Sequence, residues 1–368
     1  MNQPLEIDVE TLRNWLDREK KVTVIDIRPL EEIAEWSIPG SIHIDAYHRL
    51  KENDTSVFND SNLNKSIPLV TVCAGGKTSK VAAEILSQKG FEAYSLRDGM
   101  KGWSLAWNTA HKRFNGFEVW QIRRTGKGCL SYIIASNREA IIIDASLSLD
   151  VYSELVKQNG LSIKFVVETH THADHLSRAK PLADYFEAPL YLPGLSKAKF
   201  SFKPIDANCT FNIGKVIIGS IPTPGHTLDS FSFYIKNSVL LTGDTLFTNG
   251  VGRPDLKATL EETSEKAKLL YQSLKKMISL PDHIMVLPAH TNMPAEFDHR
   301  LIGITIREAK NNIRILQMNE EEFITSILQK IPLTPPNFFS IIERNIAGDF
   351  SDINPVDLEA GANRCAIM

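Results

Sequence analysis

Hydrophobic positions in the N-terminal part of the chain alternate between the period of a helix and that of a buried strand. Residues 8–17 have apolar side chains at helical spacing and predict a short amphipathic helix, whereas residues 22–28 form a β-branched run that predicts a buried strand. Residues 37–44 predict a turn leading into another strand, and residues 67–72 predict a third strand. This alternation is typical of an α/β domain with a parallel sheet.

The pattern changes near residue 110. Residues 108–116 are polar and lack periodicity, and we interpret them as a short connection between two domains, 1–110 and 111–368. Short strand-like runs separated by polar turns then predict antiparallel strands, followed by a helix at residues 150–158. The expected strands are residues 117–122, 129–135 and 140–144. Residues 260–278 and 320–329 predict later helices, which we interpret as cover for the core and as the surface of a homo-oligomer, most simply a dimer.

Composition supports two domains and excludes some partners. With 368 residues and 43% hydrophobic content, the chain is long enough to fill two cores. The net charge of -3 is spread along the chain without a basic stripe, which argues against nucleic acid as a partner. No apolar run approaches the ~20 residues that span a bilayer, and the N-terminus lacks the apolar core of a signal peptide. We therefore expect no membrane association and a cytoplasmic protein with reduced thiols.

One cysteine stands where a nucleophile is expected. Cys73 follows the third predicted strand, and Gly75, Gly76 and Lys77 lead from it into a predicted helix at residues 79–88. Small residues let backbone amides turn toward the sulfur, and these amides, the helix start and the lysine together favour a thiolate. A buried structural cysteine is the alternative, since cysteines are common at strand ends.

Residues 5–108 resemble a rhodanese, or sulfurtransferase, domain. The motifs that carry the resemblance occur in the order of that family: Asp26-Ile27-Arg28, Ile38-Pro39-Gly40-Ser41, the cysteine loop and Asp98-Gly99-Met100-Lys101-Gly102-Trp103. The resemblance implies that Cys73 carries a sulfane sulfur as a persulfide and that Gly75, Gly76 and Lys77 contact the substrate. Thr78 stands where many rhodaneses have arginine. A dual-specificity phosphatase is the nearest alternative, but its loop ends in an arginine, where Ser79 stands here.

A cluster of imidazoles and a carboxylate predicts a metal site in the second domain. His170, His172, Asp174 and His175 have the spacing H-x-H-x-D-H directly after the β-branched run 165–168, so they lie on a loop at the end of a buried strand. His226, Asp244 and His290 also each follow an apolar run. A lone histidine is more often a core or surface residue than a ligand, but this ordered set predicts strand-end loops that converge on one metal.

Residues 117–300 resemble the metallo-β-lactamase superfamily through this set, which implies an αβ/βα sandwich with the site at one edge. Two enzyme groups of that superfamily carry all of these residues: glyoxalase II, a thioester hydrolase with two metals, and persulfide dioxygenase, which uses one iron. The sulfur-handling domain on the same chain favours the second group. The end of the chain, Ala362-Asn363-Arg364-Cys365, also looks like the end of persulfide dioxygenases.

We therefore expect one Fe(II) per chain, held by His170, His226 and Asp244, because two histidines and one carboxylate leave positions open for a persulfide sulfur and O2. The predicted reaction oxidises a low-molecular-weight thiol persulfide, such as glutathione persulfide, to sulfite and thiol. Thiosulfate would be formed or used at Cys73, and Arg253 would bind substrate or shape its pocket. The other four candidates would surround the iron or hold a second metal: His172, Asp174, His175 and His290.

Two other functions fit the same residues. A dizinc thioesterase or lactone hydrolase would bind Zn(II) with the additional histidines and Asp174. A non-catalytic sulfur relay would use the rhodanese-like domain to dock a partner.

Overall fold

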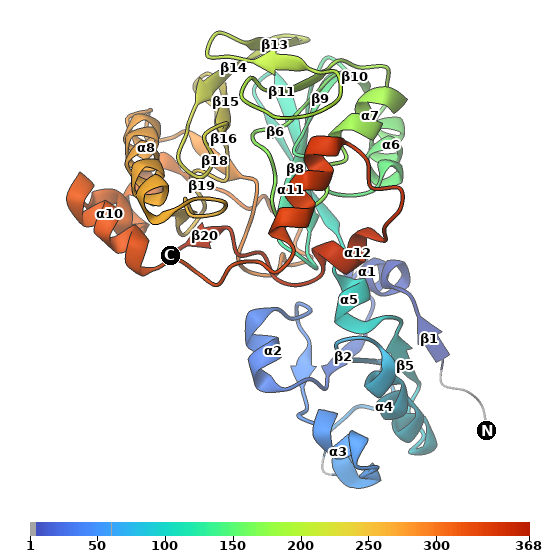
Figure 1. Cartoon of the computed structure of the whole chain (residues 1–368). Coiled ribbons are helices and arrows are strands. Elements are labelled where there is room, and N and C mark those ends of the chain that lie inside the picture. Colours follow the sequence, from blue (N-terminus) through green and yellow to red (C-terminus); the bar gives the residue numbers. More distant parts are fainter. Residues whose placement is uncertain (1–4, 60) are drawn as a thin grey trace.

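The structure, a computed structural model, describes residues 5–59 and 61–368 and contains two domains that pack against each other (Figure 1). The first domain is built on a sheet with the strand order β1-β5-β4-β2-β3, in which every pairing is parallel. Its strands are β1 Leu5–Ile7, β2 Thr23–Asp26, β3 Ile42–His43, β4 Leu69–Val72 and β5 Ala93–Leu96. The predicted parallel-sheet α/β domain is confirmed.

Helices cover both faces of this sheet, and the sheet separates two small apolar cores. They are α1 Val9–Asp17, α2 Leu30–Glu35, α3 Tyr47–Lys51, the 3-10 turn Thr55–Phe58, α4 Lys77–Gln88 and α5 Gly99–Trp103. Helix α1 begins where the sequence predicts, because the Asp8 carboxylate accepts a hydrogen bond from the Thr11 amide at 2.8 Å. Helix α4 begins directly after the cysteine loop, which positions Cys73 at its N-terminus.

The prediction of a connection at residues 108–116 is wrong. Asn108–Phe114 form strand β6, which pairs along its whole length with β7 Phe117–Arg124. Strand β6 lies at the edge of its sheet, and its exposed residues 111–113 are polar for that reason. The chain therefore passes from one domain to the other between Trp103 and Asn108.

The second domain consists of two sheets packed face to face. The seven-stranded sheet has the order β12-β11-β10-β9-β8-β7-β6, and the six-stranded sheet has the order β13-β14-β15-β16-β18-β19. The remaining strands of the first are β8 Cys129–Ser136, β9 Glu139–Ile143, β10 Ser162–Val167, β11 Leu190–Pro193 and β12 Lys203–Ile205. Those of the second are β13 Thr210–Ile213, β14 Val216–Pro222, β15 Phe231–Ile235, β16 Val239–Gly243, β18 Met285–Pro288 and β19 Ile304–Thr305. The predicted antiparallel opening is confirmed, since β6 to β9 pair antiparallel.

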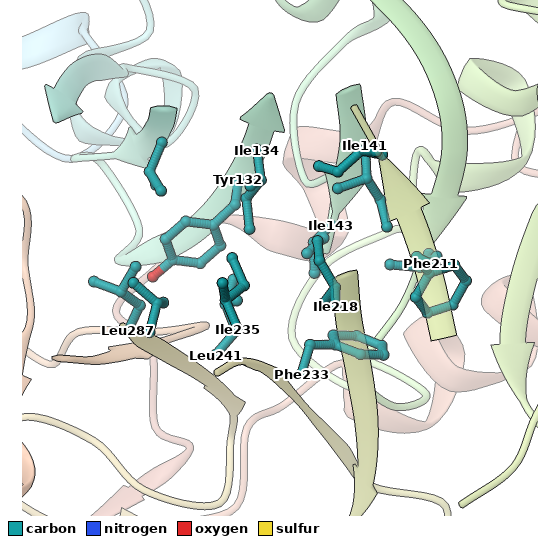
Figure 2. Close-up of a cluster of buried hydrophobic side chains, with 14 of the residues drawn as sticks. Tyr132, Ile134, Ile141, Ile143, Phe211, Ile218, Phe233, Ile235, Leu241 and Leu287 are labelled. Carbon is teal, nitrogen blue, oxygen red and sulfur yellow. The ribbon is translucent and has the colours of Figure 1, made fainter. Parts of the chain in front are cut away.

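Apolar side chains from both sheets meet between them, and Figure 2 shows Tyr132, Ile143, Phe211 and Phe233 in this layer. Helices α6 Leu149–Gln158 and α7 Ala179–Tyr185 cover the outer face of the larger sheet. The smaller sheet is covered by α8 Leu260–Ile278, α9 Ile306–Asn312, the 3-10 turn Arg314–Gln317 and α10 Glu320–Gln329. The predicted αβ/βα sandwich is confirmed, and α8 and α10 have the predicted bounds.

The C-terminal segment lies where the two domains meet (Figure 1). It contains α11 Phe338–Ala347, α12 Pro355–Glu359 and strand β20 Ala366–Ile367, which pairs with β17 Val251–Gly252. Across the interface, Trp36 donates a hydrogen bond to the Thr125 carbonyl at 3.0 Å, and Lys101 forms an ion pair with Asp357. Among the described residues, no helix is both long and apolar enough to cross a bilayer.

Candidate metal centre and cysteine loop

Four loops that follow β10, β14, β16 and β18 meet at one edge of the sandwich, as the sequence predicts. His170, His226 and Asp244 form one group, in which a ligand atom of each residue lies within 4.8 Å of the others. The His170 and His226 Nε2 atoms lie 3.8 and 3.6 Å from Asp244 Oδ2. That oxygen is buried and has no hydrogen-bond partner. An unpartnered carboxylate oxygen facing two imidazole nitrogens is the arrangement that a metal ion completes.

Hydrogen bonds on the far side of each imidazole hold the two histidines in this orientation. His170 Nδ1 lies 2.9 Å from Thr169 Oγ1, and His226 Nδ1 lies 2.7 Å from the Arg253 carbonyl. These contacts leave Nε2 of both rings for a metal. Gly225 lets the His226 loop approach α8, since its φ is +147° and a Cβ there would lie 2.4 Å from Leu270 Cα.

A second group lies beside the first and contains one residue that the sequence does not single out. Cys129, Asp174, His175 and His290 bring four donor atoms within 4.8 Å of one another. Cys129 Sγ lies 3.3 Å from Asp174 Oδ2, which is also 2.8 Å from His290 Nε2. Cys129 was missed because a single cysteine at the start of an apolar strand has the signature of a core residue.

His172 belongs to neither group. Its Nε2 lies 3.0 Å from a Glu168 oxygen and 3.2 Å from Asp144 Oδ1, and all three residues are buried. These two carboxylates outweigh burial and raise the pKa of His172 well above its usual value. His172 is therefore a charged partner of Glu168 and Asp144.

Burial and neighbouring charges favour neutral histidines and an ionised aspartate in the first group. Burial, together with the nearby His172, lowers the pKa of His170 well below its usual value, and burial also lowers the pKa of His226. Burial opposes ionisation of Asp244, but the attraction of His290 and its hydrogen bond outweigh it and lower the pKa of Asp244. Neutral imidazoles beside an ionised carboxylate are the states in which these groups bind a metal.

Side chains of the C-terminal segment hold the histidine loop in place through hydrogen bonds. The sequence analysis did not predict these contacts. The Asn345 side-chain amide on α11 donates to the carbonyls of His172 and His175, both at 2.9 Å. Glu359 at the end of α12 accepts from the Leu176 amide at 2.7 Å, and Asn363 donates to Asp174 Oδ2 at 3.0 Å. No local signal reveals these contacts, because more than a hundred residues separate the partners in sequence.

The side chain of Arg253, which was predicted to bind substrate or to shape its pocket, has protein partners for its donors. Its side chain is fully buried and forms an ion pair with Asp255 at 2.7 Å. The remaining donors bind the carbonyls of Pro332, Leu333 and Arg364. Arg253 therefore fastens the C-terminal segment beside the site.

The cysteine loop has the geometry expected for a strand-to-helix turn. Cys73 is buried, and its sulfur accepts a hydrogen bond from the Ser79 amide at 3.3 Å. Gly76 is required for the close approach of the next loop, since its φ is +83° and a Cβ there would lie 2.9 Å from the Asp98 amide. Gly75 and Lys77 are exposed beside the cysteine. Among the described residues, the hydrogen bonds of Cys73 Sγ involve Ser79, not the predicted ring of several amides.

Two families match the two domains. The rhodanese-like domain family matches residues 8–106, and the metallo-β-lactamase superfamily matches residues 124–203 and 210–290. The first match contains Cys73, and the second contains every predicted metal ligand.

Relatives of the second domain include enzymes of both groups that the sequence analysis considers. The mitochondrial persulfide dioxygenase ETHE1 of Bos taurus is 30% identical over 210 residues, which cover 54% of this chain and 75% of that protein. A hydroxyacylglutathione hydrolase of Francisella philomiragia is 31% identical over 193 residues, covering 50% of this chain and 71% of that protein. The crystal structure of ETHE1 from Myxococcus xanthus is similar with a TM-score of 0.55 and 26% identity, covering 62% of this chain and 98% of that one.

Proposed function

The chain belongs to the metallo-β-lactamase superfamily and carries a rhodanese-like domain at its N-terminus, and from this premise we propose that it is a persulfide dioxygenase coupled to sulfur transfer. The substrate is a low-molecular-weight thiol persulfide, such as glutathione persulfide. One O2 and one water are consumed for each persulfide, and sulfite and the free thiol are released. Similarity to ETHE1 proteins in sequence and in structure supports this assignment, and hydroxyacylglutathione hydrolases are similar to the chain to the same degree in sequence.

The observation that carries the proposal is the group of His170, His226 and Asp244 with its unpartnered carboxylate oxygen. Two histidines and one carboxylate on one face are typical of non-haem Fe(II) sites with open positions. Iron bound there would supply the redox chemistry that O2 requires. The protein keeps both imidazoles neutral by burial and holds each ring through Thr169 and the Arg253 carbonyl.

The contacts of the second group engage part of the donor set that a second metal would use. His290 lies between two carboxylates, with Nε2 2.8 Å from Asp174 and Nδ1 2.5 Å from Asp244. Asn363 of the C-terminal segment also donates to Asp174. These contacts engage Asp174 Oδ2 and His290 Nδ1, whereas the buried Nε2 atoms of His175 and His290 have no hydrogen-bond partner. The proposal of a single metal therefore rests on the first group and on the similarity to ETHE1 proteins.

A zinc hydrolase is the second candidate function, and one observation favours it. Cys129, Asp174, His175 and His290 offer sulfur, oxygen and nitrogen donors at close range, a combination that Zn(II) accepts. The hydroxyacylglutathione hydrolase relatives agree with this reading. In that case a second metal would displace the contact between Asn363 and Asp174.

The proposed role of Cys73 is to carry one sulfane sulfur. Its thiolate attacks the outer sulfur of a donor persulfide, the S–S bond of the donor breaks, and the donor thiolate leaves. Sulfite then attacks the outer sulfur of the Cys73 persulfide, which forms thiosulfate and returns the Cys73 thiolate. The hydrogen bond from the Ser79 amide, at the start of α4, stabilises the negative sulfur in both steps.

The test is product analysis with two substrates. Iron-loaded protein is given glutathione persulfide, and O2 uptake, sulfite and thiosulfate are measured; a thioester of glutathione is offered to the same protein and to zinc-loaded protein. We expect O2 uptake that depends on iron and equals the sum of sulfite and thiosulfate formed. Thioester hydrolysis by the zinc form without O2 uptake by the iron form would overturn the assignment.

A further inference from the structure

Lys127 is a buried cation without a carboxylate partner. It lies in the turn between β7 and β8, and only 5% of its surface is exposed. Its ammonium group donates one long hydrogen bond, 3.4 Å, to the Gly361 carbonyl. Within the described residues, no carboxylate oxygen lies within 4.0 Å of it. An ammonium group that lines a cavity without a carboxylate partner is suited to a bound anion.

The Lys127 side chain lines a cavity of about 250 Å3 that reaches the metal-binding loop. Asp174, Arg364 and Phe338 line the same cavity. Its volume lies below the roughly 300 Å3 at which sites for drug-sized ligands begin, so the cavity fits a small ion better than a whole tripeptide thiol.

This cavity shares lining residues with a larger cavity of about 460 Å3 at the cysteine loop. Glu35, Ala360, Gly361 and Ala362 belong to both. Ala74 and Gly75, which follow Cys73 directly, also line the larger cavity. Lys127 therefore stands between the loop that bears Asp174 and the loop that bears Cys73.

The other cations that line the two cavities each pair with a carboxylate. Arg364 pairs with Glu35 at 3.2 Å, Arg28 pairs with Asp26 at 2.7 Å, and Lys101 pairs with Asp357. Among the described cations that line the two cavities, Lys127 is therefore the one available to bind an anion.

We propose that Lys127 binds sulfite, a sulfur oxyanion, on its way from the metal centre to Cys73. This inference rests on the proposed function, because sulfite is the product of the dioxygenase reaction and the acceptor of the Cys73 persulfide. Sulfite held by its oxygens at Lys127 keeps the lone pair on sulfur free to attack the outer sulfur of that persulfide. The S–S bond to Cys73 breaks, thiosulfate leaves through the larger cavity, and the cysteine returns as a thiolate.

The experiment isolates this step from O2 chemistry. Full-length, metal-loaded protein is loaded with persulfide at Cys73 without O2, and thiosulfate formation is followed against sulfite concentration. Lys127→Met should raise the KM for sulfite at least tenfold with little change in kcat, whereas Lys127→Arg should restore much of the affinity. Lys112→Met, which removes an exposed lysine from β6, should leave the KM for sulfite unchanged. Hydrogen cyanide, an acceptor that is uncharged near neutral pH, should react with the same KM in wild type and Lys127→Met.

Sulfite binding and the melting temperature of the protein test the proposal even if sulfur transfer to sulfite is slow. Sulfite should raise the melting temperature of the wild type and bind to it in a calorimetric titration, and it should do neither with Lys127→Met. Without sulfite, Lys127→Met should melt no lower than the wild type, since it removes an unpaired buried charge. The inference is overturned if KM for both acceptors rises together, if sulfite binds both proteins equally, or if free glutathione displaces sulfite from Lys127. Loss of O2 uptake with sulfite binding intact would contradict only the proposed function.

Discussion

The cysteine loop and the metal centre differ in how much of the chain is needed to build each one. The sulfur of Cys73 and the amide of Ser79 that bonds to it are separated by only six residues, and one strand-to-helix turn sets their geometry. The metal centre collects side chains from four strand-end loops and is supported by Asn345, Glu359 and Asn363 of the C-terminal segment. A local site tolerates changes elsewhere in the chain, whereas an assembled site depends on distant packing.

The two sites also differ in charge. At the cysteine loop, the sulfur contacts an amide and a hydroxyl of Ser79. At the metal centre, buried carboxylates and imidazoles lie within 4 Å of one another at several points. Single substitutions at the metal centre should therefore disturb both metal binding and stability, and those at the cysteine loop should disturb chemistry alone.

The largest effect is expected from removal of a ligand. His226→Ala or Asp244→Ala should abolish iron binding and lower O2 uptake by more than about 100-fold, the upper range for residues that merely orient ligands. His283→Ala, which removes an exposed histidine of the same domain, should keep both. Metal analysis and O2 uptake check this, and iron retained in both ligand variants would rule out this ligand group.

The Cys73→Ser variant tests whether the two sites act independently. Sulfur transfer should be lost, because serine cannot form the persulfide, while O2 uptake with glutathione persulfide should stay within about twofold of the wild type. Cys209→Ser, a change of a partly exposed cysteine between β12 and β13 that belongs to neither site, should retain both activities. If folded Cys73→Ser protein also loses O2 uptake, the dioxygenase is supplied only through Cys73.

His172→Ala should affect stability more than metal binding. The change leaves Glu168 and Asp144 buried without their shared partner, at a cost of about 3 to 5 kcal/mol of unfolding free energy. Iron content should stay near that of the wild type, because His172 Nε2 contacts Glu168 and Asp144 and is not part of the group of His170, His226 and Asp244. Denaturant unfolding and iron analysis of one preparation test this, and iron loss at unchanged stability would make His172 a ligand.

A smaller effect is expected at Glu359, which pairs with the buried Arg124 at 2.8 Å and with Arg178 at 3.3 Å. Although burial opposes ionisation, these arginines lower the pKa of Glu359. The ionised carboxylate therefore stabilises the fold above the usual glutamate pKa of about 4.3, and this contribution disappears as the pH falls through the lower folded-state value. Glu359→Gln should cost about 2 kcal/mol at neutral pH. The difference from wild type should shrink in acid, and a constant difference down to the acid transition would contradict the ion-pair account.

The sequence predicts those parts of the molecule that depend on short patterns. Helices α8 and α10 repeat apolar residues over several turns, and each predicted metal ligand follows an apolar strand. Strand β6 was missed because an edge strand with one exposed face is as polar as a connection. Cys129, Asn345 and Glu359 were missed because their contacts depend on packing between segments that are far apart in sequence. The burial of Arg253 by the C-terminal segment has the same origin.

The central claim is that the metal centre holds one iron at His170, His226 and Asp244, and the most direct test is to count metals in protein purified without O2. The account predicts one iron per chain, little zinc, and O2 uptake with glutathione persulfide that rises in proportion to iron content. Two zinc ions per chain, with thioester hydrolysis proportional to zinc, would contradict it.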